Sequence, residues 1–338
     1  MKQKTVALML GCMASYAYAA DAPQYDDGTQ SVYLQYYPSS KAAPGMAHTP
    51  GLRINFPDGD ARPVEMDTGS TGIVISADAI PNIGQLTGTP GKLVYNSSGR
   101  IMIGSWVTTP VTLSGSNGTH FATAPLPVLA VTQIACQDNA RHCTPEDNPR
   151  GVAMMGVGFA REGSEQQQST PATNPLLNPA TPEGFHKGYV VTREGVHVGL
   201  NAAVTGGGFS YVKLEPDPQV AGEWQPAPVC IVVNNDPKRC GTALIDTGVT
   251  DMFLTVPHYP DKTLPDNASL TFTFTPQVSY TIAATGDDSA LAPEKVILNT
   301  TRVMPFVNTG VNFLNGFDVL YDAKQGYFGY RPVNRASQ

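Results

Sequence analysis

The tripeptide Asp-Thr-Gly occurs twice in this chain, at Asp67-Thr68-Gly69 and at Asp246-Thr247-Gly248, with the two aspartates 179 residues apart. Each copy follows a short, strand-like segment. Two such copies are expected by chance in well under about 1% of chains of this size. Taken singly, each copy is an ordinary turn that ends a strand, where Asp and Gly serve local hydrogen bonds. Taken together, they predict two carboxylates in one site.

Two neighbouring carboxylates perform a particular kind of acid–base chemistry. They cannot both ionise cheaply, so one proton is held between them. The ionised member acts as a general base on water, and the protonated member donates to a substrate carbonyl oxygen. Each glycine lets the backbone pass close to a carboxylate, and Thr68 and Thr247 are placed to link the two loops. We therefore expect Asp67 and Asp246 to be catalytic, with no metal and no cofactor.

Short strands are the elements expected to position these loops. The chain contains 33 glycines and 29 prolines, which favours turns between short strands over long helices. The Gln-, Ser-, Pro- and Asn-rich stretch 161–184 is predicted to be a long surface loop. The fold class is therefore expected to be all-β. Strands are predicted at 32–37, 52–56, 64–66, 73–76, 92–95, 100–107, 126–131, 189–191, 196–200, 210–214, 229–233, 270–274, 279–283 and 319–321.

Composition and missing motifs exclude several function classes. Hydrophobic residues make up 41% of the chain, enough for a real core. A net charge of −7 without a Lys/Arg run argues against a nucleic-acid partner. No stretch of about 18 apolar residues occurs beyond the N-terminus, so no integral membrane segment is expected there. The absence of G-x-S-x-G and H-E-x-x-H disfavours serine hydrolases and zinc metallopeptidases.

The first nineteen residues have the pattern of a signal peptide. Lys2 and Lys4 give a positive start, an apolar stretch follows, and Ala17-Tyr18-Ala19 fits a small-x-small cleavage site. A buried N-terminal helix and a lipoprotein signal modified at Cys12 are the alternatives. We expect residues 1–19 to be removed and the mature chain to be exported, to a periplasm or to the medium.

Four cysteines remain after residues 1–19. They form two local pairs, and the simplest of the three possible connectivities is Cys136–Cys143 with Cys230–Cys240. A zinc site is the alternative, but no C-x₂-C pair occurs and no histidine stands at metal spacing.

Several segments of the chain resemble the pepsin-like aspartic peptidases. Asp67-Thr68-Gly69-Ser70 is similar to the catalytic motif of that family's N-terminal lobe, and Asp246-Thr247-Gly248 to that of its C-terminal lobe. Residues 151–158 and 309–314 resemble the two apolar-apolar-Gly segments that support the active-site loops. The tail at 317–322 and 326–329 resembles the closing hairpin, and Cys230–Cys240 a small disulfide loop.

This resemblance implies an all-β, bilobal fold with double-ψ β-barrels and a substrate cleft between the lobes. The lobes would span residues 20–194, with Asp67, and 195–338, with Asp246. It further implies an endopeptidase acting on extended polypeptides, inhibition by pepstatin-type compounds, and a monomer. Thr68 and Thr247 would form interlocking hydrogen bonds beneath the aspartates, and Ser70 would donate to Asp67.

Three features depart from the family pattern. Val249 stands where a Thr or Ser usually donates to the second aspartate, and loss of that donor is expected to raise the apparent pKa of the pair, giving activity at milder acidity. Tyr95, in the hairpin-like run 95–100, is the candidate for the tyrosine that closes over substrate, with a strand-end aromatic residue as the alternative. Only residues 20–66 precede Asp67 in the mature chain, which does not fit a long propeptide.

A second class of function stays open on the same fold. A protein with an unused aspartate pair would bind peptides or proteins in its cleft without cleaving them. Retention of both aspartates and of Gly69 and Gly248 favours the enzyme, because a binding protein needs neither carboxylate.

Overall fold

The computed structural model describes residues 22–38, 46–138, 140, 143–161, 166, 168–260, 263–300 and 302–333. Strands account for 45% of the described residues and helices for 6%, which confirms the prediction of a mainly β protein. The predicted signal peptide, residues 1–19 with Cys12, lies outside the described residues. Helical structure in the described part is limited to α1 (Ala202–Thr205) and short 3₁₀ turns, η1 (Ala77–Ala79), η2 (Ile83–Gln85), η4 (Pro175–Leu177) and η5 (Val311–Asn315).

The first half of the chain forms a ten-stranded sheet around Asp67, in the order β5-β6-β9-β4-β11-β3-β2-β7-β8, with β10 paired to β9. Its strands are β2 (Gly51–Asn55), β3 (Arg62–Asp67), β4 (Thr71–Ser76), β5 (Gly88–Tyr95), β6 (Arg100–Thr109), β7 (Thr112–Ser114), β8 (His120–Ala122), β9 (Leu126–Cys136), β10 (Glu146–Asp147) and β11 (Ala153–Val157).

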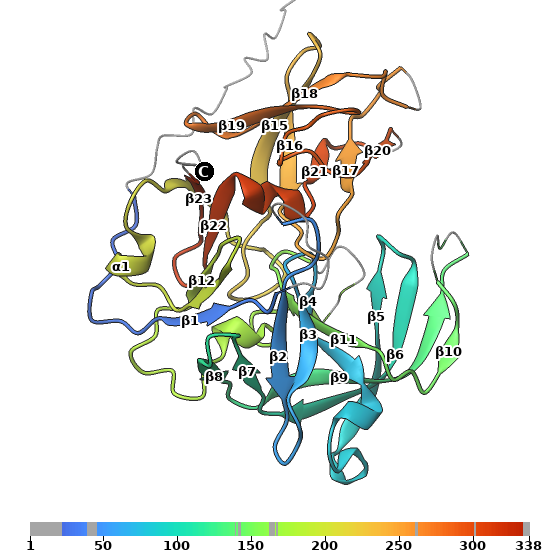
Figure 1. The fold of residues 1–338 in the computed structure, drawn as a ribbon, viewed down its shortest axis with the longest axis vertical. Helices are drawn as coiled ribbons and strands as arrows, with labels where there is room; N and C mark the ends of the chain where they lie inside the picture. The colour runs from blue at the N-terminus through green and yellow to red at the C-terminus, as the bar shows by residue number, and fades with distance from the viewer. Residues whose placement is uncertain are drawn as a thin grey trace, which may run out of the picture.

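The second half forms a seven-stranded sheet, in the order β19-β18-β15-β16-β21-β17-β20, at the opposite end of the molecule in Figure 1. Its strands are β15 (Ala227–Val233), β16 (Arg239–Leu244), β17 (Met252–Thr255), β18 (Ser269–Thr275), β19 (Val278–Ala283), β20 (Val296–Asn299) and β21 (Phe306–Asn308).

A six-stranded sheet draws its strands from both halves of the sequence, in the order β1-β13-β12-β22-β23-β14. Its strands are β1 (Val32–Gln35), β12 (Gly188–Val191), β13 (Gly195–Val198), β14 (Ser210–Lys213), β22 (Phe317–Asp322) and β23 (Tyr327–Pro332). The boundary expected between residues 194 and 195 falls in the turn that joins β12 to β13, two strands paired within this sheet.

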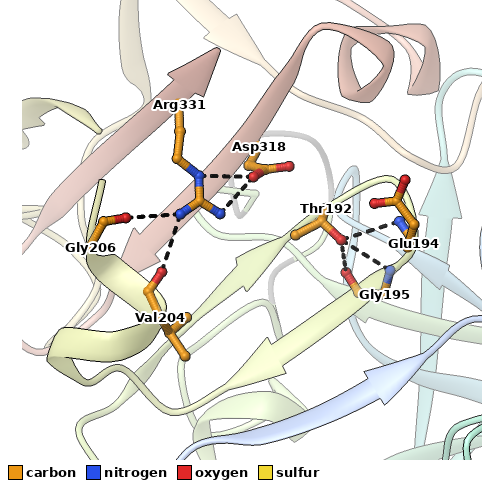
Figure 2. A network of polar contacts seen from close by, with 7 residues as sticks. All are labelled: Thr192, Glu194, Gly195, Val204, Gly206, Asp318 and Arg331. Carbon is orange, nitrogen blue, oxygen red and sulfur yellow. Dashed lines mark hydrogen bonds and ion pairs between the residues drawn. The ribbon is translucent and has the colours of Figure 1, made fainter. Parts of the chain in front are cut away.

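Polar contacts fix the end of the six-stranded sheet, as Figure 2 shows. Arg331 of β23 donates from Nε and Nη2 to Asp318 of β22, at 3.0 and 2.7 Å, and from Nη1 to the carbonyl of Gly206 after α1. In the β12–β13 turn, the Thr192 hydroxyl oxygen accepts from the backbone N–H of Gly195 at 3.1 Å. The two bonds from Arg331 to Asp318 are charge-assisted, and bonds of this kind are stronger than neutral ones.

The two large sheets contain the same arrangement of five strands. In the first half, β9-β4-β11-β3-β2 are paired parallel, antiparallel, parallel and antiparallel in turn. In the second half, β20-β17-β21-β16-β15 have the same order and the same orientations. Each aspartate loop therefore joins two strands that flank a third, β11 in one half and β21 in the other.

One buried apolar cluster connects the three sheets. Met66 and Met155 enter it from the ten-stranded sheet, Tyr321 from the six-stranded sheet, and Ile245 and Val307 from the segments around the second aspartate. Close packing of this kind resists changes of even one methylene group. The core therefore holds the two aspartate loops against each other.

The prediction of a surface loop over 161–184 is wrong for its second part. Pro175–Leu177 form the 3₁₀ turn η4, and Leu176 and Leu177 are each 2% exposed. Asn174, also buried, caps this turn by accepting from the Leu176 N–H, and its amide donates to the Val157 carbonyl at 2.9 Å. Leu176 and Leu177 bury apolar surface here, but the polar residues around them in the sequence made the whole stretch look like an exposed loop.

Candidate active site

The structure brings the two Asp-Thr-Gly loops together. Asp67 is the last residue of β3, and its partner across the parallel pair is Gly156 of β11. Asp246 follows β16 by two residues, and β16 pairs in the same parallel manner with β21. Each loop thus leaves the end of a strand held between ordered neighbours, which fixes its path.

Reciprocal hydrogen bonds lock the two loops to each other. Thr68 donates from Oγ1 to the Ile245 carbonyl, and the same oxygen accepts from the Thr247 N–H at 3.0 Å. In the mirror arrangement, Thr247 donates from Oγ1 to the Met66 carbonyl at 2.7 Å, and its oxygen accepts from the Thr68 N–H at 3.0 Å. The predicted linking role of Thr68 and Thr247 is thereby present in the geometry.

Gly69 and Gly248 allow the carboxylates to approach. A methyl group at Gly69 would lie 2.3 Å from the carboxylate carbon of Asp246, and one at Gly248 would lie 2.5 Å from Asp67 Oδ1. Both distances are shorter than any side chain tolerates without displacement. Each loop therefore packs its glycine against the aspartate of the other loop.

Each carboxylate accepts two hydrogen bonds from its own half. Asp67 accepts from the Gly69 N–H at 2.6 Å and from the Ser70 hydroxyl at 2.5 Å. Asp246 accepts from the Gly248 N–H at 2.9 Å and from the Asn308 side-chain amide at 2.5 Å. The two aspartates are only 5% and 6% exposed, so these donors replace most of the water that would otherwise solvate them.

Burial and the neighbouring carboxylate change the acidity of Asp67. Its removal from water raises its pKa, and the charge of Asp246 raises it further, while the bonds from Ser70 and Gly69 lower it. The net result is a pKa of about 8 for Asp67. A pair of this kind keeps one proton over the acidic and neutral range, and so contains an acid and a base at once.

Arg161 places a positive charge beside the pair. Its Nε donates to the Gly69 carbonyl at 2.7 Å, one residue from the motif's threonine. Burial lowers the pKa of Arg161, and the charges of Asp246 and Asp67 raise it. By the same Coulomb interaction, the guanidinium favours the ionised form of the carboxylates. It forms no ion pair within 4.0 Å among the described residues.

Tyr95 lies at the Asp67 side of the site. It ends β5, and its cross-strand partner Arg100 begins β6, so it stands at the tip of a hairpin as predicted. Burial and the charge of Asp67 raise the pKa of Tyr95, and the Ser70 hydroxyl lowers it. Its hydroxyl is buried and lies near the Ser70 hydroxyl. Its position at the end of β5 fits both interpretations of Tyr95, the tyrosine that closes over substrate and a strand-end aromatic residue.

Both predicted disulfides are present. Cys136–Cys143 ties the end of β9 to the following loop, and Cys230–Cys240 joins the cross-strand pair of β15 and β16. The second bridge precedes Asp246 in the chain, so it braces the hairpin that carries the second aspartate loop. Short loops of this size are pinned locally, since the entropic gain from a cross-link grows with loop length.

Sequence reasoning missed Asn308 and Arg161. Asn308 is the last residue of β21 and reaches Asp246 only because β21 pairs with β16. Arg161 begins a polar stretch with no motif of its own. A weak signal for Asn308 was present, because Val249 left Asp246 without the hydroxyl that Ser70 gives Asp67.

The comparisons with known proteins do not assign a family. No protein-family model matches the chain, and a search of curated proteins finds no similar sequence.

Two further properties of the described residues bear on cofactors and membranes. No group of three or more His, Cys, Asp or Glu side chains there is arranged to hold a metal ion. None of the helices found there has the length and apolar character needed to cross a bilayer.

Proposed function

We propose that this protein is an aspartic endopeptidase of the pepsin-like type. The observation that carries the proposal is the Asp67–Asp246 pair, which two Asp-Thr-Gly loops bring together through reciprocal threonine hydrogen bonds. Burying two carboxylates side by side is costly for stability, and the pKa of Asp67 is raised by burial and by the charge of Asp246. Such an arrangement is typical of sites where acid–base chemistry is performed.

The repeated five-strand unit supports the finer assignment of fold. Two equivalent units, each with an aspartate loop spanning a third strand, fit a bilobal double-ψ β-barrel protein with lobes at 20–194 and 195–338. The six-stranded sheet would be the base that joins the lobes. Tyr95, at the tip of the β5–β6 hairpin, would be the residue that closes over substrate in a cleft between them.

The proposed reaction is direct hydrolysis of a peptide bond. Water held between the aspartates loses a proton to the ionised carboxylate and attacks the carbonyl carbon of an extended polypeptide. The protonated carboxyl donates to the carbonyl oxygen, which gives a tetrahedral diol. Collapse of the diol breaks the C–N bond as a carboxylic acid of the pair protonates the leaving nitrogen. The net change is addition of one water.

Export is the second part of the proposal. Residues 1–19 have the pattern of a signal peptide, and two intramolecular disulfides are compatible with an oxidising compartment. We propose that the mature chain acts as a monomer in a periplasm or in the medium on unfolded or extended polypeptides.

The test is cleavage of an unfolded protein substrate by the purified mature chain between pH 3 and pH 7, with and without pepstatin. Asp67→Asn and Asp246→Asn are each expected to abolish cleavage, and pepstatin to inhibit the wild type. Asp78→Asn is the matched control, because this half-exposed carboxylate lies in η1 and pairs only loosely with Arg150, at 3.9 Å. Absence of cleavage by folded wild-type protein would refute the enzyme and favour a peptide-binding role.

A further inference from the structure

Asn308 and Val249 occupy positions that correspond to Met154 and Ser70 in the other half. Met154 pairs with Glu65, two residues before Asp67, and Asn308 pairs with Leu244, two residues before Asp246. Ser70 and Val249 each stand three residues after their aspartate. In the first half the loop residue is polar and the strand residue apolar, whereas in the second half the strand residue is polar and the loop residue apolar.

This exchange leaves each outer carboxylate oxygen with one donor. Ser70 donates to Asp67 Oδ2 and Asn308 to Asp246 Oδ2, each at 2.5 Å. Asn308 is 6% exposed, and its Oδ1 accepts from the Gly310 N–H at 3.0 Å. A backbone N–H can only donate, so this contact fixes the amide with Nδ2 facing Asp246.

The two donors differ in what they permit. A serine hydroxyl both donates and accepts, so Ser70 can serve either protonation state of Asp67. An amide nitrogen only donates, so a proton on Asp246 Oδ2 would face the N–H of Asn308 and lose a bond.

We infer that Asn308 is a positioning residue that replaces the missing hydroxyl at position 249 and holds Asp246 as the ionised member of the pair. Asp67 then carries the proton. This rests on the proposed function in one respect only: in an aspartic peptidase, Asp246 would be the base that takes the proton from water.

Asp67 and Arg161 carry charges that act on Asp246. Asp67 faces it from the β3–β4 loop, and Arg161 from the segment after β11. Asp251 lies five residues after Asp246 in the sequence, and Arg302 acts electrostatically on Arg161. These groups stay in place when Asn308 is changed, so a variant at 308 reports on the donor itself.

The experiment exchanges the donor between strand and loop. Asn308→Met copies the residue found at the equivalent position 154, and Asn308→Met/Val249→Ser copies both members of the first-half pair. Loss of a donor to an ionised carboxylate raises its pKa. We expect the acid limb of the kcat/KM profile to move up by about one pH unit in Asn308→Met, and the double variant to return it to the wild-type position.

Met154→Leu is the control, since it changes the equivalent strand position without touching a donor, and it should leave the acid limb unchanged. An unshifted acid limb in folded Asn308→Met would overturn the inference. So would a double variant whose acid limb stays where the single variant's lies. Should the single variant not fold, the double variant alone still decides, because the inference requires it to show the wild-type profile.

A measurement without substrate separates this inference from the proposed function. Because the lost bond is to an ionised carboxylate, Asn308→Met should lower the Tm more at pH 6 than at pH 3. Equal losses at the two pH values would overturn the role of Asn308. A wild type that hydrolyses nothing, combined with unequal Tm losses, would refute only the peptidase.

Discussion

The threonine lock between the two aspartate loops allows a stability prediction with a magnitude. Thr68→Val keeps the shape of the side chain and removes one hydroxyl. That hydroxyl bonds two backbone groups, the Ile245 carbonyl and the Thr247 N–H. Thr247 is fully buried and Thr68 is 8% exposed, so water does not replace the lost partners.

Each buried polar group left unpaired costs about 1–3 kcal/mol. Thr68→Val should therefore lower the free energy of unfolding by about 2–6 kcal/mol, a large part of the roughly 5–15 kcal/mol of a typical domain. Thr71→Val is the graded control, because the Thr71 hydroxyl donates to one backbone carbonyl, that of Gly158, at 2.8 Å. It should cost about half as much. Thr68→Ser keeps the hydroxyl and should cost the least of the three.

Urea denaturation measures these differences, provided that the m-value is unchanged. A cycle with Thr247→Val adds a second check, since the two side chains share one network and the double variant should cost less than the two single variants added together. The reasoning is refuted if Thr68→Val costs less than about 1 kcal/mol, or if Thr68→Ser is as destabilising as Thr68→Val.

Two further predictions concern charge at the site. Burial raises the folded-state pKa of Asp67 to about 8 from its ordinary 3.8, so the folded protein prefers the protonated form of this side chain. The stability that protonated Asp67 contributes is therefore complete at low pH and is lost as the pH rises from about 4 to about 8. Urea titrations at pH 4, 6 and 8 should show wild-type stability falling with pH and a flatter dependence in Asp67→Asn, and equal slopes would contradict the assignment. Arg161→Met removes a cation that favours ionised carboxylates, so the acid limb of kcat/KM should move to higher pH. The control Arg150→Met removes an arginine whose side chain is 90% exposed and should leave the profile unchanged, whereas a downward shift in Arg161→Met would count against the electrostatic reasoning.

The parts of the fold that the sequence predicted are those where local pattern and long-range structure agree. The strands expected at 52–56, 64–66 and 73–76 are present as β2, β3 and β4, because short runs with apolar or β-branched residues stand there between Pro, Gly and Asp. The strands β16 and β21 were not predicted. Arg239–Leu244 contains Gly and Cys, and Phe306–Asn308 has three residues. Their pairing with each other, not their local composition, makes them strands.

The same division applies to the site. Asp67, Asp246 and the two threonines were predictable because they belong to a tripeptide that occurs twice in the sequence. Asn308 was not, because it lies 62 residues from Asp246 in sequence and approaches it through a strand pairing. Val249 was expected to leave Asp246 without a donor. The Asn308 amide supplies that donor to Asp246 Oδ2 instead. The predicted shift to milder acidity therefore loses the basis that Val249 gave it, while burial remains a cause.

The comparison of the two halves shows what the repeated fold requires at each carboxylate. Each aspartate needs a donor on its outer oxygen, because at 5–6% exposure water supplies little solvation and a buried polar group without a partner is costly. What matters is that a donor lies next to this oxygen, whichever residue of the chain provides it. Ser70 meets it from the loop and Asn308 from the adjacent strand. A substitution at the loop position is therefore no sign of a lost function when the strand position has changed with it, and the two positions have to be read as a pair.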